Sequence, residues 1–172
     1  QIKPAYVRLN TLLNTEIDRE LIDDSGQHLI AKPELFRSDF FEKGQGLIQD
    51  INSQKVVPYL NLKAGDCVLD CCCGPGTKTV QIANLLENTG SVVGIELHES
   101  RSLATQELLD RCGVKNTEVI TSDVLDYQTD KEFDSILLDA PCSGLGVLSH
   151  KHDLRYHIQP EDLDELVEIQ KD

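Results

Sequence analysis

Beyond about residue 65, short apolar runs alternate along the chain with longer segments of helical periodicity. Short runs rich in β-branched residues predict strands, and apolar positions three or four residues apart predict helices. Strands are predicted at 67–73, 91–96, 117–122 and 135–139, and helices at 78–88 and 100–112. Strands that alternate with helices form a parallel sheet through right-handed crossovers. The pattern therefore predicts an α/β fold, with a mostly parallel sheet and helices on both of its faces.

The first 45 residues differ from this regular alternation. A strand is predicted at Tyr6–Asn10 and a polar helix at about Thr15–Asp23, and the rest of the segment is rich in turn residues. We therefore expect residues 1–45 to form a small N-terminal α/β flanking subdomain, and residues 46–172 to form the main domain. Near their junction, an amphipathic helix is predicted by apolar residues at helical spacing, namely Ile48, Ile51, Val56 and Leu60.

Composition narrows the class of protein. Of the 172 residues, 40% are apolar and 27% charged, and the chain has neither a run of about eighteen apolar residues nor a signal-peptide pattern. We therefore expect a cytoplasmic globular protein with one main domain. Three of the six cysteines are adjacent, unlike the spacing in small secreted disulfide-rich domains, so we expect free thiols.

The formal net charge of -14 argues against nucleic-acid binding by the chain as a whole, because phosphate contacts need lysine and arginine gathered on one surface. A polyanionic partner would have to meet a local patch. The densest cationic stretch consists of His150, Lys151, His152, Arg155 and His157. Both an RNA phosphate contact and a solvated helix start are open interpretations of this stretch.

Acidic residues lie at the ends of successive predicted strands. Asp70 belongs to the first of these strand ends and Glu96 to the second, while Asp123 and Asp139 lie at the third and fourth. The carboxyl ends of parallel strands meet at one edge of a sheet, where open α/β folds bind ligands. Glu96 lies twenty residues beyond Gly76, a position from which an acid accepts hydrogen bonds from ribose hydroxyls in dinucleotide folds. Since a lone strand-end acid can also cap a helix, the constellation predicts the site.

The loop after the first of these strands lies in the segment VLDCCCGPGTKT, residues 68–79. It is not a P-loop, because Cys72 and Thr77 stand where that motif has glycine. It is not a dinucleotide fingerprint, because Thr79 replaces the third glycine. A tight turn against a nucleoside without a pyrophosphate tolerates both losses, which favours S-adenosylmethionine as the cofactor. The alternative is a strand-to-helix turn that binds no ligand.

These segments resemble the two signatures of the Sun/RsmB (NOP/Sun) family of S-adenosylmethionine-dependent RNA cytosine-C5 methyltransferases, whose nearest bacterial members methylate ribosomal RNA. The family's cofactor loop reads D-x-C-A-A-P-G-G-K-T. The chain matches it at Asp70, Cys72, Pro75, Gly76, Lys78 and Thr79. It departs from it at Cys73, Gly74 and Thr77. The second signature, D-A-P-C-S-G, is matched at 139–144.

Two N-terminal segments, VRLNT at 7–11 and GLIQDINSQ at 46–54, also resemble segments of this family. The resemblance implies a Rossmann-like class I methyltransferase fold and an RNA substrate, with ribosomal RNA as the expected one. It implies catalytic roles for Asp139, which hydrogen-bonds the base, and for Cys142, which helps to release the product. It further implies cofactor contacts from Cys72, Cys73, Gly74, Pro75, Gly76, Thr77, Lys78, Glu96, Asp123 and Asp139.

Methylation of cytosine at C5 needs a thiol, because C5 is a poor nucleophile until a thiolate has added at C6. In the RNA family this thiolate lies in a later Thr-Cys segment, whereas DNA cytosine-C5 methyltransferases use a Pro-Cys cysteine, the arrangement of Cys142. The 172 residues end at Asp172 before such a segment, so we expect this fragment to be inactive alone. The alternatives are a DNA or small-molecule methyltransferase, and a non-catalytic cofactor-binding module that scaffolds RNA.

Only Cys72 of the cysteine triplet has a counterpart in the family. Cys71 and Cys73 are expected to be small buried residues where the strand packs against helices, since cysteine is among the most often buried residue types. A zinc site is the alternative. It would need two C-x-x-C or Cys/His pairs, which Cys67 and the triplet do not supply, so we expect no metal.

Overall fold

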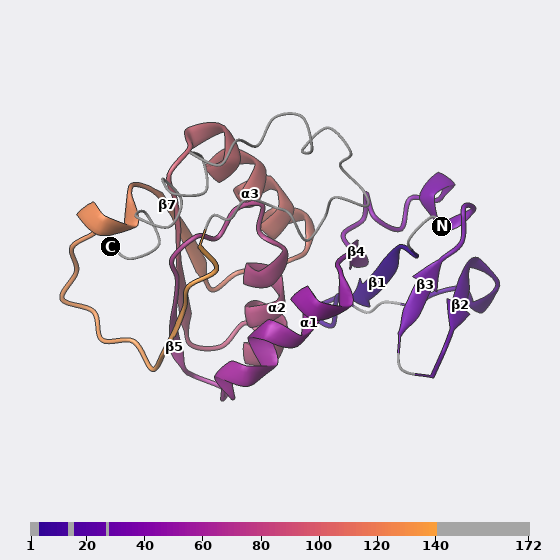
Figure 1. Cartoon of the computed structure of the whole chain (residues 1–172), viewed down its shortest axis with the longest axis horizontal. Helices are drawn as coiled ribbons and strands as arrows, with labels where there is room; N and C mark the ends of the chain where they lie inside the picture. Colours follow the sequence, from indigo (N-terminus) through magenta and orange to yellow (C-terminus); the bar gives the residue numbers. More distant parts are fainter. Residues whose placement is uncertain (1–3, 14–15, 27, 141–172) are drawn as a thin grey trace, which may run out of the picture. The chain divides into compact units, whose positions relative to one another are not determined.

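The computed structural model describes residues 4–13, 16–26 and 28–140 (Figure 1). Pro4–Leu138 forms one compact unit, and Asp139 begins the described part of a second unit. The first unit contains two four-stranded sheets, one antiparallel and one parallel. Among the described helices, none has the length and apolar character needed to cross a membrane.

The parallel sheet is built from the four apolar runs that the sequence pattern identifies. Its strands are β5 (Cys67–Asp70), β6 (Ser91–Glu96), β7 (Thr117–Thr121) and β8 (Ser135–Leu137). They lie in the order β7-β6-β5-β8, so β6 and β7 are on one side of β5 and β8 is on the other. The predicted parallel α/β fold is confirmed. Strand order reverses at β5, and ligands of open α/β sheets bind outside the carboxyl ends of strands at such a point.

Helices connect these strands as the alternation predicts. The helix α2 (Thr77–Leu86) joins β5 to β6, and α3 (Glu99–Arg111) joins β6 to β7. After α3, Gly113 has a φ of 72°, a left-handed conformation that glycine adopts readily at helix ends.

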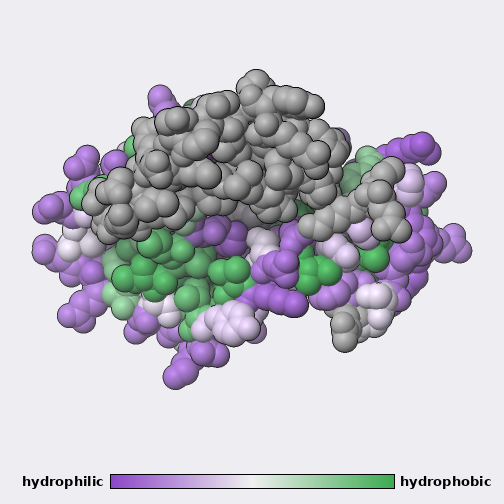
Figure 2. Space-filling model, in the orientation of Figure 1, coloured by the Kyte–Doolittle hydropathy of each residue, from purple (hydrophilic) through white to green (hydrophobic). Residues whose placement is uncertain are grey.

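The two faces of the parallel sheet bury different side chains, because alternate residues of a strand point to opposite faces. One face packs Val68 and Val92 against Ile82 and Leu86 of α2. The other face consists of Leu69, Cys71, Val93 and Ile95, and residues of the β7–β8 connection pack against it. On the side of β8, Ile136 and Leu138 are exposed. Figure 2 shows hydrophobic surface in the region of β5.

An antiparallel sheet, here called the N-terminal sheet, precedes the parallel one. Its order is β2-β3-β1-β4, and its core cluster contains Val7, Ile22, Leu35 and Phe40. Short 3-10 helices lie beside it at Arg19–Leu21 and Leu35–Arg37. The strands are β1 (Tyr6–Leu9), β2 (Ile22–Asp24), β3 (Leu29–Ala31) and β4 (Gly46–Ile48).

Two predictions in this region need correction. The helix predicted at about 15–23 is wrong, because Arg19–Leu21 forms one 3-10 turn and Ile22 begins β2. Ile22 pairs with Ala31 and is 3% exposed, so sheet pairing and burial override the local polar pattern.

The amphipathic helix predicted from Ile48 begins later than expected, since Ile48 itself ends β4. Asp50 caps the helix by accepting a hydrogen bond from the amide of Asn52 at 2.9 Å. The helix then runs as α1 (Ile51–Val56) and continues as a 3-10 helix over Val57–Leu60.

Candidate cofactor site

Asp70 ends β5 with its carboxylate inside the fold, 1% exposed. Its Oδ2 accepts a hydrogen bond from the hydroxyl of Thr79 at 2.8 Å. Thr79 is buried in the first turn of α2, so this bond ties the end of the strand to the start of the helix across the intervening loop. Asp70 therefore has a structural contact that fixes the shape of the loop.

The loop between β5 and α2 is held by backbone hydrogen bonds. The amide of Cys73 donates to Ile95 O at 2.9 Å, and the amide of Gly76 donates to Cys73 O at 2.7 Å. Gly76 has a φ of 97°, and a Cβ there would lie 3.1 Å from Thr105 Cγ2 and 3.2 Å from Leu108 Cδ2. Glycine is thus needed here both for its left-handed conformation and for the close approach of α3.

Glu96, the last residue of β6, is buried beside this loop and 4% exposed. Its Oε1 accepts a hydrogen bond from the amide of His98 at 3.1 Å. A Cβ at Gly74 would collide with Oε2 of Glu96. The structure therefore brings two predicted parts of the site into contact, because the absence of a side chain at Gly74 lets the backbone of the loop approach a buried carboxylate.

Arg101 of α3 completes this contact and was not identified from the sequence. Its Nη2 donates to Gly74 O at 2.8 Å and lies 3.4 Å from Oε2 of Glu96. Half of the Arg101 side chain is exposed. No sequence signal distinguishes this arginine from other charged residues of α3, since its role depends on how closely α3 packs against the loop.

Asp123 follows β7 and has the capping role that was the alternative for a lone strand-end acid. Its Oδ1 accepts a hydrogen bond from the amide of Leu125 at 3.0 Å, at the start of a 3-10 helix over Val124–Asp126. The side chain is exposed. Ser122, its neighbour, donates its amide to Glu96 O at 3.1 Å, so Asp123 lies one residue from the end of β6. A role in cofactor binding stays a prediction.

The remaining predicted residues divide between the loop and the end of the described chain. Pro75 is exposed, and Cys72, Thr77 and Lys78 are half-buried. Asp139 follows β8 by two residues and is exposed, in the second unit of the chain. Cys142 and the cationic stretch at 150–157 lie outside the described residues.

Cys71 and Cys73 are buried neutral thiols rather than nucleophiles. Cys71 and Cys73 are 8% and 3% exposed, which confirms the prediction that they are buried. Burial raises the pKa of both thiols, and that of Cys73 to about 12 with the help of the nearby Asp70 and Glu96 charges. The thiols of Cys67, Cys71, Cys73 and Cys112 are free, and the described residues include no His/Cys/Asp/Glu group that could hold a metal ion.

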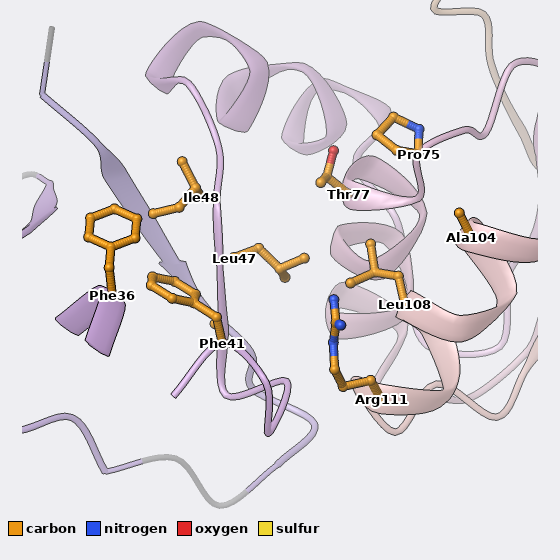
Figure 3. Close-up of a pocket in the computed structure, with 10 residues that line it drawn as sticks. Phe36, Phe41, Leu47, Ile48, Pro75, Thr77, Ala104, Leu108 and Arg111 are labelled. Atoms are coloured by element: carbon orange, nitrogen blue, oxygen red, sulfur yellow. The ribbon is translucent and has the colours of Figure 1, made fainter. Parts of the chain in front are cut away.

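A pocket of about 490 Å³ lies beside the loop (Figure 3). Phe36, Phe41 and Leu47 line it from the N-terminal sheet and its flanking segment, and Leu108 and Arg111 line it from α3. Pro75 and Thr77 of the loop also line it, whereas Asp70 and Glu96 do not.

Residues 57–172 match the sequence model of the 16S rRNA methyltransferase RsmB/F family. The chain belongs to this RsmB/F family. S-adenosylmethionine is the cofactor of RsmB/F methyltransferases, as predicted from the loop. The family match thus confirms the resemblance on which the predicted site residues rest, although the individual contacts stay predictions.

Curated RsmB/F relatives are longer than the chain. It is 37% identical over 147 residues to the probable ribosomal RNA small subunit methyltransferase B of Bacillus subtilis, covering 82% of this chain and 32% of the relative. It is 37% identical over 138 residues to the tRNA (cytosine(72)-C(5))-methyltransferase of Pyrococcus horikoshii, covering 77% of this chain and 34% of the relative. The chain spans about a third of the length of these relatives.

A solved structure supports the same fold. NSun6 from Pyrococcus horikoshii, crystallised with the S-adenosylmethionine analogue SFG, aligns with a TM-score of 0.71 at 30% identity. The alignment covers 85% of this chain and 40% of the NSun6 chain. The Rossmann-like methyltransferase fold is thereby confirmed.

Proposed function

We propose that the chain carries the cofactor-binding part of an RNA cytosine-C5 methyltransferase that acts on ribosomal RNA. The observation that carries this proposal is the contact between the glycine loop and the buried carboxylate of Glu96 at the switch point of a parallel sheet. Such a loop leaves room for a nucleoside beside an acid that can accept hydrogen bonds from its ribose. The residues present therefore fit S-adenosylmethionine.

In this proposal the chain's residues bind and orient, and bound S-adenosylmethionine supplies the methyl group on a sulfonium that leaves as a neutral thioether. Glu96 accepts hydrogen bonds from the ribose hydroxyls, and its Oε2 exchanges the 3.4 Å contact with half-exposed Arg101 for them. The loop over 72–78 and Asp123 would help to hold the cofactor. A carboxyl at Asp139 hydrogen-bonds the cytosine edge and stabilises the charge that develops at N3.

Support for cytosine C5 as the methyl acceptor comes from two sources. The D-A-P-C-S-G segment at 139–144 resembles the second family signature. The relative from Pyrococcus horikoshii is named as a cytosine-C5 methyltransferase, though of tRNA. The relative from Bacillus subtilis is named for small-subunit ribosomal RNA, and this favours ribosomal RNA as the substrate. The cytoplasmic location predicted from composition stays a prediction.

Deletion of the full-length gene whose product includes this chain tests the proposal. Nucleoside mass spectrometry of small-subunit ribosomal RNA from the deletion strain should show less 5-methylcytidine than the parent, and the wild-type gene should restore it. An Asp139→Asn gene should not restore it, whereas a Glu132→Gln gene, altered at an exposed acid before β8, should. Unchanged 5-methylcytidine would refute the proposal, and a loss confined to tRNA would identify tRNA as the substrate instead.

A further inference from the structure

One face of α2 carries polar side chains although the helix is largely buried. Thr77, Gln81 and Asn84 are spaced four and three residues apart, so they lie along one face of the helix. Gln81 is 7% exposed and Asn84 is 8% exposed. Buried polar groups need hydrogen-bond partners, so another part of the chain must supply partners for this face.

The partners come from the N-terminal sheet and the segment after it. Arg8, in β1, donates from Nη2 to Thr77 O at 2.9 Å and from Nη1 to Asn84 Oδ1 at 2.8 Å. Its Nε donates to Gln49 Oε1 at 2.6 Å. One guanidinium thus bonds to the backbone carbonyl of the first residue of α2, to the Asn84 side chain and to the residue that follows β4.

The hydrogen bonds continue on both sides of Arg8. Gln49 donates from Nε2 to Gln81 Oε1 at 3.2 Å. Gln81 is the middle residue of the polar face. Asn84 donates from Nδ2 to Asn10 Oδ1 at 2.8 Å. Asn10, fully buried, donates in turn to Gly44 O and to Cys112 O, both at 2.8 Å. The network therefore joins the N-terminal sheet to the start of α2 and to the end of α3.

Burying the charged guanidinium of Arg8 costs free energy unless its N–H groups find hydrogen-bond acceptors. Burial lowers the pKa of Arg8 to about 10, so the guanidinium is still protonated at neutral pH. Its three acceptors are neutral oxygens, and no described carboxylate pairs with it. The planar guanidinium of arginine has donors at fixed directions and can bond to three separated acceptors at once. The single ammonium of lysine cannot reach the same three acceptors.

We propose that Arg8 is a positioning residue for cofactor binding, because it holds Thr77, and with it the loop over 72–78, in the conformation that binds the cofactor. The inference rests on the proposed function for the location of the cofactor. In this inference the N-terminal sheet contributes to cofactor binding through Arg8. It also gives a physical reason for the presence of VRLNT and GLIQDINSQ beside the glycine loop, since Arg8, Asn10 and Gln49 come from these two segments.

The test compares Arg8→Lys with Val7→Ala in the 172-residue chain. Val7 is 4% exposed in the same strand but packs in the core of the N-terminal sheet, so Val7→Ala weakens the sheet without removing a hydrogen bond of the network. Amide hydrogen exchange by mass spectrometry reports the loop and first turn over 73–80. Calorimetry with S-adenosylhomocysteine reports the affinity of the folded protein.

We expect Arg8→Lys to speed exchange over 73–80 at least tenfold, to leave β7 unchanged and to weaken S-adenosylhomocysteine binding at least fivefold. Val7→Ala should change neither. Wild-type exchange and affinity in folded Arg8→Lys, or equal changes in Val7→Ala, would overturn the inference. If Arg8→Lys does not fold, Asn84→Ala, which removes the acceptor of Nη1, should show the same changes to a smaller degree.

Failure of the proposed function has a different signature. A wild-type chain that binds no S-adenosylhomocysteine contradicts the cofactor site, while the exchange experiment, which needs no ligand, still decides whether Arg8 holds the loop.

Discussion

Replacement of Glu96 by alanine should weaken cofactor binding at least tenfold. The carboxylate is 4% exposed and lies against Gly74, so a ribose bound there would meet an acceptor that water screens little. Each hydrogen bond to a charged group contributes about 1.5–3 kcal/mol. Two such bonds to the ribose hydroxyls would contribute about 3–6 kcal/mol.

Part of this gain is offset in the free protein. Glu96 gives up its 3.4 Å contact with Arg101, whose side chain is half exposed, and an ion pair of that kind contributes about 0–1 kcal/mol. Ordering of the bound ligand lowers the net gain further. A loss of at least about 1.4 kcal/mol remains, which corresponds to a factor of ten in the dissociation constant.

Isothermal titration calorimetry with S-adenosylhomocysteine measures this loss, with circular dichroism as the check on folding. Glu96→Gln should fall between wild type and Glu96→Ala, because it keeps an acceptor oxygen but loses the charge. Glu99→Ala, at the exposed first residue of α3, is the matched control and should bind as wild type does. A folded Glu96→Ala protein with wild-type affinity would remove Glu96 from the cofactor site.

Three further predictions concern RNA, activity and pH. With a net charge of -14, the 172-residue chain should bind RNA weakly and with a shallow salt dependence in filter binding, and tight, steeply salt-dependent binding would contradict this. The chain alone should not transfer a tritiated methyl group to ribosomal RNA, and transfer that Cys142→Ala abolishes would show that the Pro-Cys thiol is the nucleophile. Because the pKa of Cys73 is raised from its ordinary 9.0 to about 12, the unfolded chain loses this proton first, so stability should fall above about pH 9. Urea unfolding should show that Cys73→Ala reduces the fall between pH 8 and pH 10 by about 1.4 kcal/mol, and an unchanged fall would contradict the raised pKa.

The parallel sheet and the acid at its second strand could be predicted from the sequence, because both depend on local order along the chain. Each strand of the sheet is a short apolar run, and the alternation with helices leaves few topologies to consider. Glu96 follows from the length of one strand-helix-strand unit. In the N-terminal sheet, by contrast, Ile22 pairs with Ala31 across a turn, and the local pattern of apolar residues does not predict that pairing.

The contacts that shape the loop could not be predicted, because they join residues far apart in the sequence. Arg101 meets Gly74 only because α3 packs against Gly76 closely enough that a side chain there would crowd Thr105. Arg8 meets Asn84 across 76 positions, which requires the N-terminal sheet to pack against α2. Sequence resemblance drew attention to the segment around Arg8, but it carried no information about what the arginine contacts.

The guanidinium of Arg8 also constrains how this sequence can drift over evolutionary time. Gln49, Asn84 and the Thr77 carbonyl share one side chain, so a change at position 8 leaves several buried acceptors without a donor at once. Single substitutions at positions 8, 49 and 84 should therefore be strongly epistatic, and lineages that replace one of these residues should replace the others with it. An alignment of the family should show these three positions varying together, while exposed neighbours such as Leu85 vary independently.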